Sequence, residues 1–190
     1  MAFDMERVRN GIREALRGMG LDPNEPGLVD TPDRVARFLA EFRQEHDFAD
    51  ILKSEFDYSG ESGAMVIQTD IPFRAICEHH LLPFFGHAHI GYIPTNKVVG
   101  LSKLTRLVQA VGTYRPSIQE HITNKIADLL KKHLNPLGVI VVTEAEHTCM
   151  TIRGVNAPGV KTVVSAVRGV FRDVPAARHE FLSLIEKRRR

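Results

Sequence analysis

Two short segments of the chain carry the side chains best suited to chemistry. Cys77-Glu78-His79-His80 lies near the middle of the sequence, and His147-Thr148-Cys149 lies in its last third. Thiolate sulfur and imidazole nitrogen suit zinc, and three protein ligands leave a fourth position for water, as in catalytic zinc sites. The spacing therefore predicts a metal site made by Cys77, His80 and Cys149.

The pair His79-His80 indicates that binding and reaction are divided between two side chains. Neighbouring residues in extended backbone point to opposite faces, so one metal ion rarely binds both. We expect one histidine to bind the metal and the other to react. The simpler interpretation is a reduced core cysteine beside ordinary polar histidines, and the second segment with histidine and cysteine argues against it.

The N-terminal part of the chain has the pattern of helices. Apolar residues recur at helical spacing between Val8 and Met19, and glycines and prolines then interrupt the pattern. We expect a second helix to begin with Thr31 as its cap and Pro32 at its first position. Residues 1–50 are therefore predicted to form an N-terminal helical arm, and residues 51–190 the main domain.

The elements that must position the two segments follow from residue 65 onward. Apolar and β-branched runs predict strands over residues 71–76, 85–93, 139–142, 148–153 and 162–167. Helical spacing predicts a helix capped by Ser102, a longer one after Pro116, and a terminal helix around residues 181–185. Strands and helices arrive in blocks, which predicts an α+β fold: an antiparallel sheet with helices on one face.

Composition and charge limit the class of protein. The chain has 190 residues, 43% of them hydrophobic, which suffices for one domain with a helical appendage. A formal net charge of +2 does not require nucleic acid or a membrane as a partner. The basic run Lys187-Arg188-Arg189-Arg190 is interpreted as a solvated helix end.

The cysteines and the apolar segments bear on the compartment. Two cysteines, each close to histidine, form no disulfide framework, so we expect reduced thiols in a cytoplasmic protein. The start of the sequence lacks the pattern of a signal peptide, and no apolar stretch reaches membrane-spanning length. We therefore expect a protein that is neither exported nor inserted in a membrane.

These residues resemble the signature stretches of the GTP cyclohydrolase I family. The stretches are Cys77-Glu78-His79-His80, Gly100-Leu101-Ser102-Lys103, Gln119-Glu120, His147-Thr148-Cys149 and Arg153-Gly154, in the family's order and spacing. The resemblance implies a zinc enzyme that converts GTP to 7,8-dihydroneopterin triphosphate and formate, the entry step to folate or related pterins. Zinc would activate a water for attack on guanine C8, His79 and His147 would move protons, and Ser102 would lie near the ribose.

The same resemblance assigns the residues that bind the nucleotide. The chain lacks a P-loop, and the family positions for the triphosphate are occupied by Arg34, Arg37, Lys103, Arg106 and Arg153. Glu120 matches the carboxylate that would accept hydrogen bonds from guanine, with Gln119 beside it. A helix capping box from Ser117 to Glu120 is the competing interpretation of that carboxylate. Ser117 replaces a usual glutamine, and residues 111–115 are one residue longer than the family pattern.

The resemblance also implies an assembly. The family has the tunnelling fold (T-fold), in which sheets of neighbouring subunits join edge to edge, and two pentamers stack into a ring-shaped homodecamer. Open sheet edges give a physical reason to oligomerise. Three other interpretations stay open: a related zinc hydrolase that stops at the ring-opened formamide, a non-catalytic zinc-stabilised assembly module, and a nucleic-acid binder that uses the basic tail.

Overall fold

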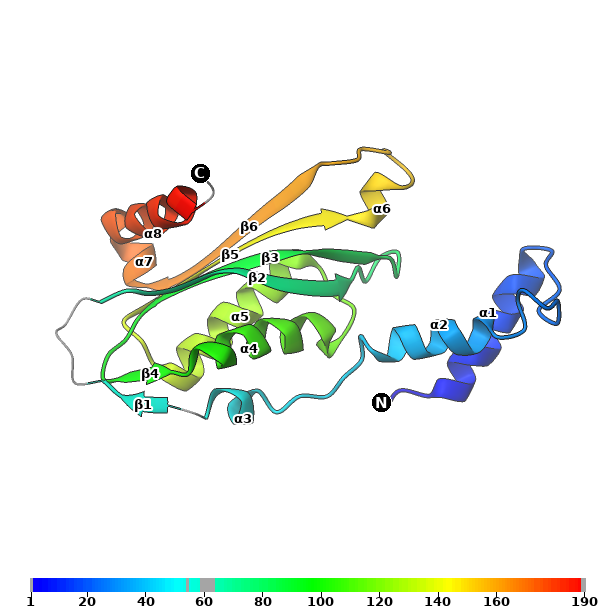
Figure 1. Cartoon of the computed structure of the whole chain (residues 1–190), viewed down its shortest axis with the longest axis horizontal. Helices are drawn as coiled ribbons and strands as arrows, with labels where there is room; N and C mark the ends of the chain where they lie inside the picture. Colours follow the sequence, from blue (N-terminus) through cyan, green and yellow to red (C-terminus); the bar gives the residue numbers. More distant parts are fainter. Residues whose placement is uncertain (1, 54, 59–63, 189–190) are drawn as a thin grey trace. The chain divides into compact units, whose positions relative to one another are not determined.

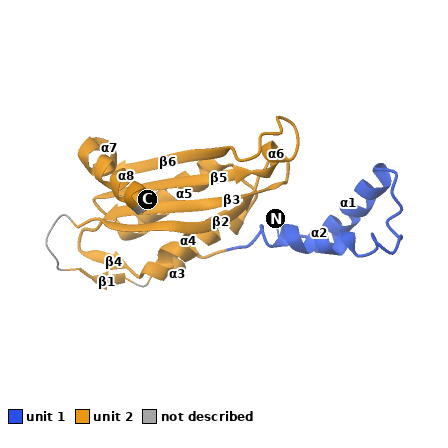
Figure 2. Ribbon diagram, turned by 45° about the horizontal axis from the view of Figure 1, so that its top comes forward, with its two compact units in different colours: residues 1–45 blue, residues 46–190 orange. Residues whose placement is uncertain are grey.

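The computed structural model describes residues 2–53, 55–58 and 64–188 (Figure 1). The chain divides after Glu45 into two compact units, residues 1–45 and residues 46–190, shown in separate colours in Figure 2. Arg189 and Arg190, half of the predicted basic run, lie outside the described residues. The described part of the chain holds no helix that is both long and apolar enough to span a bilayer.

The first unit consists of helices α1 (Met5–Gly18) and α2 (Thr31–Ala40). The Asp4 side chain caps α1 by accepting a hydrogen bond from the backbone N–H of Arg7. The predicted cap of α2 was wrong by one position, because Asp30 is the N-cap and Thr31 is already helical. The backbone N–H of Thr31 donates to the carbonyl of Leu28, so the preceding turn leads directly into the helix.

The second unit is built on a four-stranded antiparallel sheet with strand order β2-β3-β5-β6. Its strands are β2 (Val66–Ile76), β3 (Pro83–Ile93), β5 (Gly138–His147) and β6 (Lys161–Gly169), and β1 (Glu55–Asp57) pairs separately with β4 (Lys97–Val99). The helices are α3 (Phe48–Leu52), α4 (Leu101–Tyr114), α5 (Gln119–Leu134), α6 (Thr148–Thr151), α7 (Val170–Asp173) and α8 (Pro175–Arg188). The predicted α+β class and antiparallel pairing are confirmed.

The sheet is covered on both faces, so the prediction of helices on one face was incomplete. Side chains of β5 alternate: Val139 and Val141 join the core under α4 and α5, whereas Ile140 joins the cluster under α8. Phe181 of α8 packs over Gly91, where a Cβ atom would lie only 2.6 Å from its ring. Figure 1 shows α4 and α5 on one side of the sheet and α7 and α8 on the other. A strand that is apolar at every position buries both of its faces.

Two further local predictions were wrong. Residues 148–153 do not form a strand, because β5 ends at His147 and α6 begins at Thr148. The Thr148 hydroxyl donates to the carbonyl of Pro83 at 2.6 Å, a long-range contact that overrides the strand propensity of a β-branched residue. Gly100, not Ser102, precedes α4, and Ser102 lies in its first turn.

Candidate metal centre and active site

A tight turn between β2 and β3 holds the first two predicted ligands. The N–H of Cys77 donates to the carbonyl of Leu82, and the N–H of Leu81 donates to the carbonyl of Cys77, both at 2.9 Å. Leu81 adopts a left-handed conformation with φ of 53°. The turn brings Cys77 Sγ to 3.8 Å from Nδ1 of His80.

Strand pairing and the short helix α6 bring the third ligand to the same place. His147, the last residue of β5, lies opposite Phe84 of β3 in the register of the two strands. Helix α6 then turns the chain back, fixed by the contact between Thr148 and Pro83. As a result, the ligand atoms of Cys77, His80 and Cys149 all lie within 4.8 Å of one another.

This donor set fits a zinc ion. Sulfur and nitrogen ligands of tetrahedral zinc lie about 3.5 Å apart at the usual bond lengths, close to the separation of Cys77 and His80. Burial raises the pKa of the Cys149 thiol, and the nearby Cys77 raises it further, while the charge of Arg153 lowers it. Two thiolates this close repel each other unless a cation lies between them, and a divalent ion would relieve that repulsion.

His147 is held in a defined orientation beside the three predicted metal ligands. Its ring stacks on Phe84 with centroids 4.4 Å apart and planes 9° apart. Its Nε2 lies 2.8 Å from Oε1 of Gln119. Burial lowers the pKa of His147, and the charge of Glu120 opposes this shift. The neutral imidazole is therefore favoured by its surroundings more than it would be in water.

Gln119, which was predicted to bind substrate, has its side-chain amide held by hydrogen bonds within the chain. The residue is 1% exposed, and its Nε2 lies within hydrogen-bonding distance of the carbonyls of Thr143 and Thr162 and of the Thr143 hydroxyl. Its Oε1 contacts His147. Those contacts make Gln119 a link between β5, β6 and the histidine.

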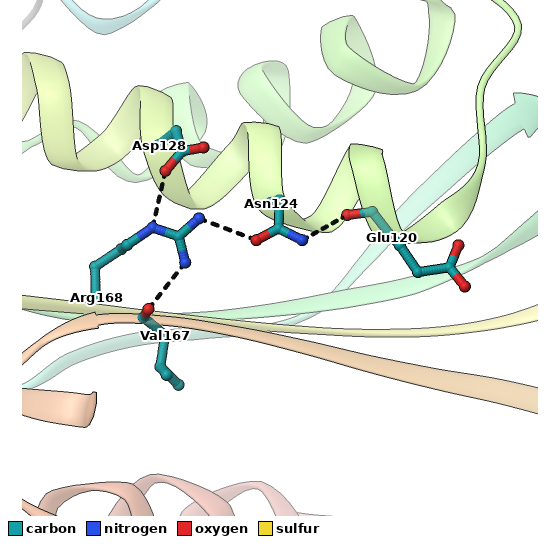
Figure 3. A network of polar contacts seen from close by, with 5 residues as sticks. All are labelled: Glu120, Asn124, Asp128, Val167 and Arg168. Atoms are coloured by element: carbon teal, nitrogen blue, oxygen red, sulfur yellow. Dashed lines mark hydrogen bonds and ion pairs between the residues drawn. The ribbon is translucent and has the colours of Figure 1, made fainter. Parts of the chain in front are cut away.

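Glu120 lies in the first turn of α5, where its side chain is exposed, and it is not part of a capping box. The backbone N–H of Ser117, which such a box would bond to Glu120, donates instead to the carbonyl of Ile76 at 2.8 Å. Figure 3 shows the Glu120 carboxylate pointing away from the polar network that joins α5 to β6. In that network Asn124 donates to the Glu120 carbonyl, and Arg168 contacts both Asn124 and Asp128.

A cavity of about 240 Å³ lies between these elements. The cavity brings together the predicted metal ligands, both predicted catalytic histidines and the first residues of α5. Its walls include Cys77, His79, His80, Glu120, His147 and Cys149. Two thiols, three imidazoles and a carboxylate around one cavity can bind a metal, move protons and recognise hydrogen-bond donors on a ligand.

Gln119 also lines this cavity, whereas Ser102 and the five predicted phosphate-binding residues do not. Ser102, Lys103 and Arg106 lie in the first turns of α4, and the cavity wall is reached only after the last residue of that helix, Tyr114, at Ser117. A helix of this length, 14 residues, spans about 20 Å. Figure 1 shows the start of α4 beside β4, at the other end of the sheet from α6.

The predicted arginines differ in their surroundings. Arg153 follows α6, is exposed, and is close enough to affect the Cys149 thiol. Arg34 and Arg37 lie in the first unit, where they pair with Asp30 and Asp33 at 3.0 and 2.9 Å. Both guanidinium groups are mostly exposed, and exposed pairs of this kind are weak, so a phosphate could compete for them.

Sequence reasoning missed the residues that hold His147 and Cys149 in place. Phe84, Thr143, Thr148 and Thr162 have no chemistry that a motif would single out. Their roles follow from the pairing of β3 with β5 and of β5 with β6. The one feature of the sequence that could have indicated such a role is the position of Phe84, directly after the turn that carries the predicted ligands Cys77 and His80.

Comparisons with known proteins find one family over almost the whole chain. A sequence model of GTP cyclohydrolase I matches residues 8–186. The GTP cyclohydrolase 1 of Aquifex aeolicus (strain VF5) is 50% identical over 186 residues, covering 98% of this chain and 99% of that protein. The protein of the same name from Bacillus subtilis (strain 168) is 49% identical over 185 residues, covering 96% of each. One from Geobacillus sp. (strain WCH70) is 51% identical over 185 residues, covering 95% of this chain and 96% of that protein.

Proposed function

Since the chain belongs to the GTP cyclohydrolase I family, we propose that it hydrolyses GTP at guanine C8, releases formate and forms 7,8-dihydroneopterin triphosphate. One observation of the structure carries the proposal: the Cys77–His80–Cys149 cluster shares its cavity with His79, His147 and Glu120. Such a cavity combines metal ligands, groups that transfer protons and a base-recognising carboxylate. The enzyme is accordingly a hydrolase that acts on cyclic amidines.

Zinc is the cofactor that this site would take, with Cys77, His80 and Cys149 as its ligands. When bound, it would supply a Lewis acid that activates water for attack on C8. The two thiols would have to stay reduced to serve as ligands, as they do in the cytoplasm.

The protein's own side chains would then move protons and hold the base. A histidine that protonates N7 makes C8 more electrophilic, and His147 and His79 both face the cavity where the purine would lie. Glu120 would accept hydrogen bonds from the ring N–H and the exocyclic amine of guanine. Adenine lacks that pair of donors, so the carboxylate would select GTP over ATP.

The triphosphate site would be completed by another copy of the chain. Ser102, Lys103 and Arg106 lie at the end of α4 away from the cavity of their own chain, and a neighbouring subunit could supply them instead. Arg34, Arg37 and Arg153 would add positive charge. Among the described residues, β2 and β6 each pair on one side only, which leaves two edges for the T-fold ring and for a decamer of two pentamers.

The decisive experiment incubates zinc-loaded protein with GTP and follows formate together with the oxidised, fluorescent pterin. ATP and a zinc-chelated sample are the controls. Formate and pterin from GTP alone are the expected result. A formamide without pterin would instead identify a hydrolase that stops after ring opening, and unchanged GTP in the presence of bound zinc would identify an assembly module.

A further inference from the structure

We propose that Gln119 is a positioning residue that keeps a proton on Nε2 of His147, so that Nδ1 is the nitrogen that exchanges protons with the substrate. This inference rests on the proposed function only for the identity of that substrate. The hydrogen bonds around the Gln119 amide carry it.

The orientation of the Gln119 amide is fixed by two backbone carbonyls. Its Nε2 lies 3.2 Å from the carbonyl oxygen of Thr143 and 3.1 Å from that of Thr162. Carbonyl oxygens only accept hydrogen bonds, so the amide nitrogen, which only donates, must face them. The amide oxygen consequently faces Nε2 of His147 at 2.8 Å.

Two buried hydroxyl groups agree with this orientation. Thr123 Oγ1 donates its only hydrogen to the backbone carbonyl of Gln119, at a distance of 2.7 Å. In its 2.8 Å contact with Thr143 Oγ1, Thr123 must therefore accept, and Thr143 must donate. A lone pair of Thr143 Oγ1 then remains for the Gln119 amide at 3.0 Å. A reversed amide would break this chain of donors and acceptors.

Burial prevents water from replacing these partners. Gln119 is 1% exposed, and both Thr123 and Thr143 are 0% exposed. A rotated amide would place its oxygen against two carbonyl oxygens in a region of low polarity, where unpaired polar groups are costly. The side chain therefore keeps one orientation.

The consequence for His147 is a defined tautomer. The Gln119 oxygen has only lone pairs to offer, so Nε2 of His147 must carry a hydrogen. Stacking on Phe84 fixes the plane of the ring. Among the groups of the described residues none bonds Nδ1, so Nδ1 is the ring nitrogen left for the substrate while Nε2–H stays bonded to Gln119. A neutral amide orients the ring in this way without adding charge.

The first test determines the tautomer of the His147 ring by spectroscopy and does not depend on enzyme activity. Zinc-loaded protein containing ¹⁵N-labelled histidine would be measured by solid-state NMR, with the His147 signals identified by their loss in His147→Asn. We expect the neutral ring to be protonated at Nε2 in the wild-type protein. A ring protonated at Nδ1 would overturn the proposal, whatever the enzyme does with GTP.

The second test compares Gln119→Met with Thr113→Val. Methionine matches the length of glutamine and offers no comparable acceptor, so kcat should fall about 100-fold, while KM for GTP changes less than about threefold. Zinc content should be unchanged, and the His147 signals should show a mixture of tautomers. Thr113→Val in α4 removes a buried hydroxyl that donates to the Gln109 carbonyl, outside the hydrogen bonds around Gln119 and His147, and should change kcat less than about threefold.

Each outcome separates this inference from the proposed function. Wild-type kcat in Gln119→Met, or an equal loss in Thr113→Val, would reduce Gln119 to a structural role. A wild-type protein without activity on GTP whose His147 still loses its single tautomer in Gln119→Met would reject the proposed function and retain the positioning role.

Discussion

The two neighbouring histidines of the turn between β2 and β3 differ in their surroundings. The rings of His79 and His80 lie 6.3 Å apart and nearly perpendicular, with an angle of 85° between their planes. Only His80 contacts the Cys77 sulfur. Both rings line the cavity, so a metal ion held by His80 would leave His79 available to the substrate.

This difference predicts opposite effects of two alanine substitutions. His79→Ala should keep bound zinc, and its kcat should fall about 10²- to 10⁴-fold because a proton-transfer group is lost. Cys149→Ala should lose zinc, since two protein ligands cannot complete a stable site. Metal analysis of the purified proteins together with formate release checks both. Equal loss of zinc in the two variants would contradict the division between ligand and reacting group.

At the scale of elements, the position of the cavity depends on how closely α4 approaches β2. Gly112 of α4 faces the backbone of β2, and a Cβ atom there would lie 2.4 Å from the carbonyl oxygen of Arg74. The chain after α4 then bonds to the end of β2 through Ser117 and Ile76. The close approach of α4 thus leads into the segment that carries Gln119 and Glu120.

We therefore predict that Gly112→Ala lowers the free energy of unfolding by about 1–3 kcal/mol, because backbone atoms cannot move aside as a side chain can. Gly11→Ala in α1 is the matched control, since nothing lies within 4 Å of its added Cβ atom. That substitution should stabilise its helix by about 0.5–1 kcal/mol. Urea unfolding of both variants measures the difference, and a Gly112→Ala protein as stable as the wild type would show that α4 can shift without loss.

At the scale of the whole molecule, the apolar core belongs to the second unit. Both clusters of buried side chains are made of residues between Phe48 and Ile185. The four-stranded sheet and the predicted metal ligands lie in the same unit. Nothing in these two clusters requires residues 1–45.

A chain consisting of residues 46–190 should therefore fold and bind zinc. We expect cooperative urea unfolding and one zinc ion per chain, with weaker binding of GTP because Arg34 and Arg37 are absent. Circular dichroism, metal analysis and GTP titration check these outcomes against the full chain. Gradual, non-cooperative unfolding of the shortened chain would show that the first unit contributes to the stability of the second.

Local patterns in the sequence were enough to predict a candidate metal site and most of the helices and strands. Cysteine and histidine have few partners other than metals and protons, so Cys77, His80 and Cys149 could be predicted from residue type and spacing. Helical and strand periodicity reflects burial along one element, and it located α1, α5 and β3 to within a few residues, whereas β2 begins at Val66, earlier than the predicted strand of residues 71–76. The α+β class followed from the order of those elements.

Tertiary structure decided what depends on contacts between distant residues. The pairing of β3 with β5 placed Phe84 against His147, and the contact from Thr148 to Pro83 turned an expected strand into α6. Contacts with Thr143 of β5 and Thr162 of β6 bury the Gln119 side chain at the cavity wall, next to His147. Periodicity describes one element at a time, whereas strand register and buried hydrogen bonds join elements far apart in the chain. That is why the sequence could indicate candidate reacting groups, and only the folded chain determined which side chains hold them.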